Sequence, residues 1–91
     1  MLSPMKKTKP LPSAREIFGL NVRRARRLRE ISQEELAFQA GISRPYLSEV
    51  ESGSINISVD NMEALSKALE IGLPDLLRAD LFAINTKDHD A

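Results

Sequence analysis

The chain has 91 residues, no cysteine and a formal net charge of zero, which together predict a single domain with a small core and exclude disulfides, thiolate metal sites and cysteine nucleophiles. Its longest apolar runs are too short to cross a membrane, and no apolar stretch follows the N-terminal lysines as it does in a secretory signal. We therefore expect a protein of the reducing cytoplasm that has no membrane association.

The chain begins with a segment that differs from the rest. Residues 1–12 contain three prolines and three lysines without periodicity, so we expect a flexible basic arm. A first helix is expected after Ser13, because Ser13 and Glu16 have the spacing of a capping box. The apolar residues of this helix fall on roughly one stripe, which consists of Ile17, Phe18, Val22, Ala25 and Leu28.

The zero net charge conceals an uneven distribution along the chain. Through Arg29 there are nine lysine and arginine residues against Glu16 alone, whereas from Glu30 onward there are four against twelve acidic residues. Exposed arginines often form no more than a solvated surface. A basic first third with a net charge of +8 nevertheless favours a polyanionic partner.

Two short helices are expected between residues 32 and 53. Ser32 and Glu35 have capping-box spacing, and Leu36, Ala37 and Ala40 lie on one face of the helix that follows. Gly41 can turn the chain in a left-handed conformation, Ser43 can cap a second helix with Leu47 and Val50 on its inner face, and Gly53 closes it. This pattern has the outline of a helix-turn-helix, although an ordinary helical hairpin shows the same signals.

The outer face of the second of these helices distinguishes a DNA-binding helix-turn-helix from an ordinary helical hairpin. If Leu47 faces the core, Val50 and Glu51 stay near it, and the residues that point away are Pro45, Ser48, Glu49 and Ser52. Arg44 lies at the entry to this helix and Tyr46 on its flank. Arginine can donate twice to guanine and a carboxylate can accept from cytosine, so the face is suited to reading base edges.

The rest of the chain predicts two further helices. Ser58 is expected to cap a fourth helix, whose buried stripe is Met62, Leu65, Ala68 and Leu69, and Gly72 is expected to break it. Leu73 and Pro74 begin a fifth helix, which is followed by more apolar surface than it needs for itself. We place the domain at residues 13–84 and a polar tail at residues 85–91.

We find no sign of an enzyme. The only histidine, His89, lies in the polar tail, and the glutamates have helix spacings that favour capping and pairing. The sequence has no Gly-rich phosphate loop, no metal-ligand cluster and no nucleophile–base set. We therefore expect no catalysis, no cofactor and no metal.

Several motifs at ordered spacing resemble the DNA-binding core of phage-repressor and Cro-like regulators, the xenobiotic-response-element type of helix-turn-helix protein. They are Val22-Arg23, Arg26, SQEELA, Gly41, YLSEVESG and NIS…ALSKALEIGLPDLL, over roughly residues 18–77. The resemblance implies an all-α, compact five-helix lambda-repressor-like domain with the helix-turn-helix at helices 2 and 3. It implies a sequence-specific double-stranded DNA-binding transcription regulator, a repressor that acts as a homodimer on a near-palindromic operator.

The resemblance also assigns residues. Base readout is expected from Arg44, Pro45, Ser48 and Glu49, although Pro45 can offer only an apolar contact. DNA backbone contacts are expected from Gln33, Ser43, Tyr46, Ser52 and Asn56, with Tyr46 also near a thymine methyl, and arm contacts from Lys6, Lys7 and Lys9. Because proline disfavours helical geometry in the residue before it, the second helix of the motif, called here the reading helix because it would contact the bases, is expected to start at Pro45. Family members often have glycine at the position of Glu30, so the turn here must be right-handed or mildly strained.

Two further features follow from the resemblance. Arg26 and Glu51 are expected to form an ion pair. A dimer interface is expected on Leu77, Leu81, Phe82 and Ile84, since Leu77, Leu81 and Ile84 have helical spacing, while Leu73 and Leu76 are assigned to the core. An antitoxin with a toxin protein as its main partner, and a restriction–modification controller protein, have the same fold, and the sequence does not choose among these functions.

Overall fold

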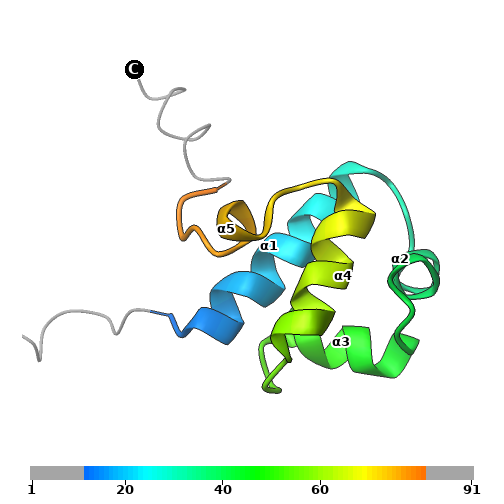
Figure 1. Ribbon diagram of the computed structural model, residues 1–91, viewed down its shortest axis with the longest axis horizontal. Coiled ribbons are helices and arrows are strands. Elements are labelled where there is room, and N and C mark those ends of the chain that lie inside the picture. The colour runs from blue at the N-terminus through cyan, green and yellow to red at the C-terminus, as the bar shows by residue number, and fades with distance from the viewer. Residues whose placement is uncertain (1–11, 82–91) are drawn as a thin grey trace, which may run out of the picture.

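The computed structural model describes residues 12–81, which contain five helices and no strand. The helices are α1 (Ala14–Leu28), α2 (Gln33–Ala40), α3 (Arg44–Ser52), α4 (Val59–Leu69) and α5 (Leu73–Leu76). α1 packs against α3, α4 and α5, and α2 packs against α3 and α4 (Figure 1). The all-α five-helix expectation is confirmed, but the reading helix starts at Arg44 and not at Pro45.

Serine side chains begin each of the first four helices. Ser13, Ser32, Ser43 and Ser58 each accept a hydrogen bond from the backbone amide three residues later. Glu16 completes the capping box of α1, because it accepts from the Ser13 amide at 2.8 Å. In α2 the Glu35 carboxylate instead accepts from the Gln39 side-chain amide at 2.7 Å. Of the capping box expected there, only the hydrogen bond to the Ser32 side chain is formed.

The chain reverses through left-handed residues at four helix ends. Gly41 and Gly53 have φ of 73° and 75°, as expected. Glu30, with φ of 58°, has the strained conformation rather than the right-handed one. The prediction that Gly72 breaks α4 is wrong, because Glu70 (φ 60°) already ends that helix and Gly72 serves as the N-cap of α5.

The core lies where α1, α3 and α4 meet α2 and α5. Its fully covered large side chains are Phe18, Val22, Leu36, Leu47, Leu65 and Leu76. Leu28 was expected on the buried stripe but is 71% exposed. It lies about 80° around the helix from Phe18, and just beyond this end of α1 the exposed Arg29 donates to the Ala68 carbonyl oxygen of α4 at 3.2 Å.

The fifth helix is a single turn. Asn21, buried in α1, donates to the carbonyl oxygens of Leu76 and Arg78 at 2.8 and 2.9 Å. These two bonds join the end of α5 to α1, and the Arg78 carbonyl oxygen also accepts from the Leu81 amide at 3.3 Å. The helical stripe predicted through Leu77 and Leu81 is wrong because α5 ends at Leu76, and Leu81 packs in part against the core of its own domain.

Candidate nucleic-acid interface

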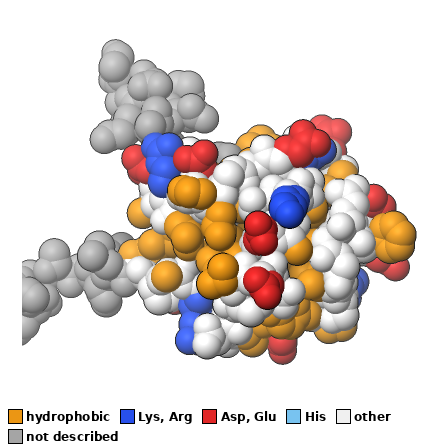
Figure 2. Space-filling model, in the orientation of Figure 1, with side chains coloured by type: hydrophobic (Ala, Val, Ile, Leu, Met, Phe, Trp, Pro, Cys, Tyr) orange, Lys and Arg blue, Asp and Glu red, His pale blue; other side chains and the backbone are white. Residues whose placement is uncertain are grey.

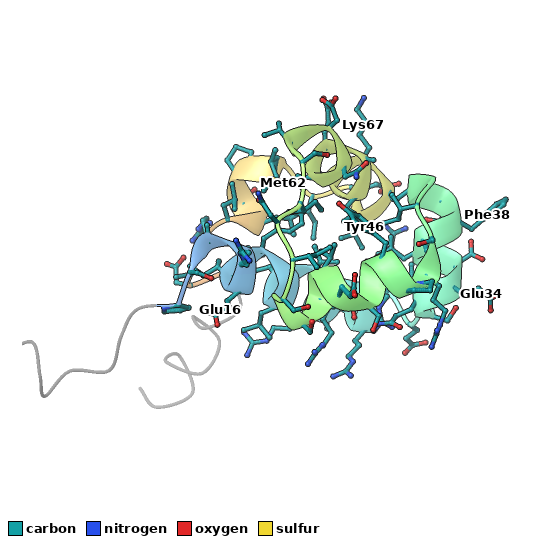
Figure 3. All side chains as sticks on the ribbon, turned by 90° about the horizontal axis from the view of Figure 1, so that it is seen from below. Glu16, Glu34, Phe38, Tyr46, Met62 and Lys67 are labelled. Atoms are coloured by element: carbon teal, nitrogen blue, oxygen red, sulfur yellow. The ribbon has the colours of Figure 1, made fainter. Side chains whose placement is uncertain are left out.

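The outward face of α3 carries polar groups that the fold does not use. Arg44, Pro45, Ser48 and Glu49 are exposed, while Leu47, Val50 and Glu51 of the same helix are buried. Figure 3 views the molecule from the side of α3. Within residues 12–81, the side chains of Arg44, Ser48 and Glu49 form no hydrogen bond or ion pair. A guanidinium, a hydroxyl and a carboxylate are thus available to a ligand on one face of a helix.

The flanks of this face are more tightly held. The half-buried Tyr46 is turned towards α4, and its hydroxyl accepts from the Asn61 side-chain amide at 3.1 Å. The Ser52 hydroxyl donates to the Glu49 carbonyl oxygen at 2.9 Å. Ser43, through its side chain, caps α3, and Asn56 is exposed in the loop before α4.

The inner face of the same helix carries a buried carboxylate, that of Glu51. Arg26 Nε donates to Glu51 Oε2 at 2.7 Å and Arg26 Nη2 to Oε1 at 2.9 Å, so the expected ion pair is present and bidentate. Only 1% of the Glu51 side chain is exposed. Its hydrogen bonds raise the pKa of the Arg26 guanidinium above the ordinary value. Arg26 Nη1 also donates to the Ile31 carbonyl oxygen at 3.0 Å, which joins the pair to the turn before α2.

Gln33 belongs to this cluster as well. Its side-chain amide donates to Glu51 Oε1 at 3.0 Å. Sequence reasoning missed this contact, because Gln33 and Glu51 are 18 positions apart and lie on different helices. The residue expected to hold a phosphate is therefore positioned by the carboxylate that also holds Arg26.

Some predicted residues lie elsewhere. Lys6, Lys7, Lys9, Phe82 and Ile84 fall outside the described residues. Leu77 is 38% exposed at the end of α5.

Within residues 12–81 no cluster of acidic or histidine side chains is arranged to hold a metal ion. No helix in this range has the length and apolar character needed to span a membrane.

A helix-turn-helix family model matches residues 22–76, which include all five helices except the first part of α1. The chain belongs to the Cro- and phage-repressor-like helix-turn-helix family. It is 45% identical over 64 residues to the control protein C.BamHI of Bacillus amyloliquefaciens, covering 69% of this chain and 79% of that protein.

Solved structures agree with this assignment. The restriction-modification controller protein C.AhdI from Aeromonas hydrophila superposes with a TM-score of 0.66 at 39% identity, over 68% of this chain and 94% of that one. The P22 c2 repressor, in a complex with a synthetic operator, superposes with a TM-score of 0.65 at 32% identity, over 69% and 96% of the two chains. In this helix-turn-helix domain, α2 and α3 form the motif.

Proposed function

We propose that this helix-turn-helix protein is a sequence-specific transcription regulator of the restriction–modification controller class, which acts as a homodimer on a near-palindromic operator. The observation that carries the proposal is the set of polar side chains on the outer face of α3 that have no polar partner within residues 12–81. The likeness to C.BamHI, a control protein, and to the P22 c2 repressor, which was solved with its operator, supports the same function.

Base readout is assigned to the first two turns of α3. The Arg44 guanidinium suits the two acceptors of a guanine in the major groove, and the Glu49 carboxylate suits a cytosine amine. Ser48 can donate to or accept from either kind of base. Pro45 has no backbone N–H, so its contribution is an apolar contact, for which a thymine methyl is the natural partner.

The backbone contacts are assigned around this face. Gln33 uses one amide hydrogen for Glu51, and its second amide hydrogen can donate to a phosphate at the N-terminus of α2, where the helix favours an anion. Ser43, Ser52 and Asn56 are exposed at the ends of α3 and in the following loop. Because the Tyr46 hydroxyl already accepts from Asn61, we assign its DNA contact to the ring rather than to the hydroxyl.

The homodimer follows from the small size of the reading surface. One helix reads a few base pairs, and two-fold dimers of helix-turn-helix domains bind half-sites about one helical turn apart. Leu77 and Leu20 are exposed large apolar side chains, and hydrophobic side chains gather around α5 on the face shown in Figure 2. An apolar surface at α5 suits an isologous contact with a second copy.

Selection of bound duplexes from a random pool tests the proposal. The wild-type protein should enrich a two-fold symmetric motif with half-sites about 10 base pairs apart. The variant Ser48→Ala with Glu49→Ala should enrich an altered or weaker motif. A pool that shows no enrichment would contradict sequence-specific binding, and an asymmetric single site would contradict the dimer. Occurrence of the motif upstream of restriction–modification genes in the source genome would support the controller class.

A further inference from the structure

The arginines near the end of α1 have different structural surroundings. Arg26 is buried against Glu51, and Arg29 donates to the Ala68 carbonyl oxygen on α4. Arg24 and Arg27 are exposed, and within residues 12–81 they make no polar side-chain contact. Arg23 differs from all four, because it approaches the buried carboxylate of α3 from the solvent side.

Arg23 lies close to one carboxylate oxygen of Glu51. Arg23 Nε lies 3.9 Å from Glu51 Oε1, and this same oxygen accepts from Gln33 Nε2 at 3.0 Å. Arg23 of α1 and Gln33 of α2 therefore approach the same oxygen from different helices, and this oxygen also accepts from Arg26 Nη2 at 2.9 Å. Arg23 also borders a surface groove together with Ser52, the last residue of α3.

The charges at this point do not cancel. Glu51 supplies one negative charge, and the bidentate contact with Arg26 already balances it. Arg23 adds a second positive charge whose side chain is 36% exposed. Its Nε faces Glu51, and its two Nη atoms have no partner within residues 12–81. A partly exposed guanidinium whose Nη donors are not engaged in this range can form a bidentate contact with a phosphate.

We propose that Arg23 binds a backbone phosphate of the duplex and forms, with Gln33, a phosphate clamp at the edge of the α3 reading surface. This inference rests on the proposed function. Glu51 is then a positioning residue, because its carboxylate accepts a hydrogen bond from Gln33 and lies 3.9 Å from Arg23 Nε. Phosphate contacts carry no base information but fix the register of a protein on the duplex, so the clamp sets how α3 enters the groove.

Salt-dependent binding of the full chain to its selected operator tests this assignment. Arg23→Ala should lower the slope of log K against log salt by about 0.9 per protomer, which corresponds to one lost phosphate contact. Arg24→Ala is the matched control, because it removes the same charge one position away. Its slope should stay close to that of the wild type. Arg23→Lys should retain most of the wild-type slope.

Phosphate-ethylation interference gives a position-specific readout. In the wild type one phosphate per half-site next to the α3 contacts should interfere, and this interference should disappear in Arg23→Ala. Arg23→Gln, which keeps a polar stem beside Glu51, serves as a second variant and should show the same loss. An unchanged slope in these variants, or equal losses in the Arg23 and Arg24 variants, would overturn the clamp while leaving the proposed function intact. A wild type without salt-dependent operator binding would overturn both.

Discussion

Gly19 of α1 lies directly against the backbone carbonyl of Val50 in α3. A Cβ atom at position 19 would overlap the Val50 carbonyl oxygen and press on that of Glu51. The two helix backbones can therefore meet only because residue 19 has no side chain. This close approach also fixes the distance across which Arg26, two turns further along α1, reaches Glu51.

Gly19→Ala should destabilise the domain. Alanine favours a helix by up to about 1 kcal/mol over glycine, but here the added methyl forces apart two backbones, and overpacking of this kind costs about 1–3 kcal/mol or more. Urea unfolding followed by circular dichroism measures the difference. Gly72→Ala is the control, because a Cβ there meets its nearest described atoms only at 3.8 Å, and it should cost less than Gly19→Ala, no more than the loss of a favourable N-cap residue. Equal stability of the Gly19 variant and the wild type would contradict the packing described.

The Arg26–Glu51 pair makes a second prediction. Replacing either residue with alanine removes the main partner of a buried charge, which should cost about 3–5 kcal/mol in the free energy of unfolding. Replacing both, with Arg26→Met and Glu51→Leu, should recover much of the loss. Lys67→Ala tests an exposed pair in α4, where Lys67 and Glu63 are 3.9 Å apart, and should change stability by less than about 0.5 kcal/mol. Similar small losses at both pairs would show that the buried pair is not desolvated.

The strained turn before α2 predicts a stabilising change. Glu30 has φ of 58° and its side chain has no polar contact within residues 12–81, so Glu30→Gly should relieve strain and raise the stability by about 1 kcal/mol. Gly41→Ala is the reverse experiment. Its added Cβ meets no atom of residues 12–81 within 4 Å, so any loss reports the backbone conformation. Thermal unfolding of the two variants should shift in opposite directions, and a lower midpoint for Glu30→Gly would contradict the argument.

Arg44→Ala tests base readout. We expect a loss of about 1–3 kcal/mol on the selected operator and relaxed preference at one base pair per half-site, because a bidentate contact to guanine is removed. Fluorescence anisotropy with operator and with random duplex measures both quantities. If affinity fell equally on the two duplexes, Arg44 would be a phosphate contact instead.

The dimer can be tested at Leu77. Leu77→Asp places a charge on the exposed end of α5 and should convert dimer to monomer with unchanged helicity, as seen by sedimentation velocity and circular dichroism. Val59→Asp is the control, since Val59 is a 69% exposed apolar residue at the start of α4 and should leave the dimer intact. A wild type that stays monomeric at high micromolar concentration without DNA would rule out a preformed dimer.

The features that could be predicted from sequence are those set by nearby residues. The serine caps depend on atoms three residues apart, and the turns at Gly41 and Gly53 depend on glycine alone. The inward turn of Glu51 followed from helical geometry, whereas its pairing with Arg26 was inferred from the family resemblance. These local signals were sufficient for the helix order and for the outward face of α3.

The features that could not be predicted depend on contacts distant in sequence. The end of α5 is joined to α1 by Asn21, which lies 55 positions before Leu76 and donates to its carbonyl oxygen. From the sequence alone, the glycine in the middle of α1 predicts only a less stable helix. Its packing role becomes evident when the Val50 carbonyl is found against it. The convergence of Arg23 and Gln33 on one oxygen of Glu51 likewise appears only once three helices are assembled.

The division of α3 into two faces has a consequence for how such a protein could diversify. The inner residues Leu47, Val50 and Glu51 hold the helix in the domain, whereas the side chains of Arg44, Ser48 and Glu49 form no hydrogen bond or ion pair in the part of the chain described here. Exchanging the outer set therefore breaks none of the polar contacts that maintain the fold. The outward positions of α3 can thus be substituted as a set, so that the same fold could bind a new operator with little loss of stability.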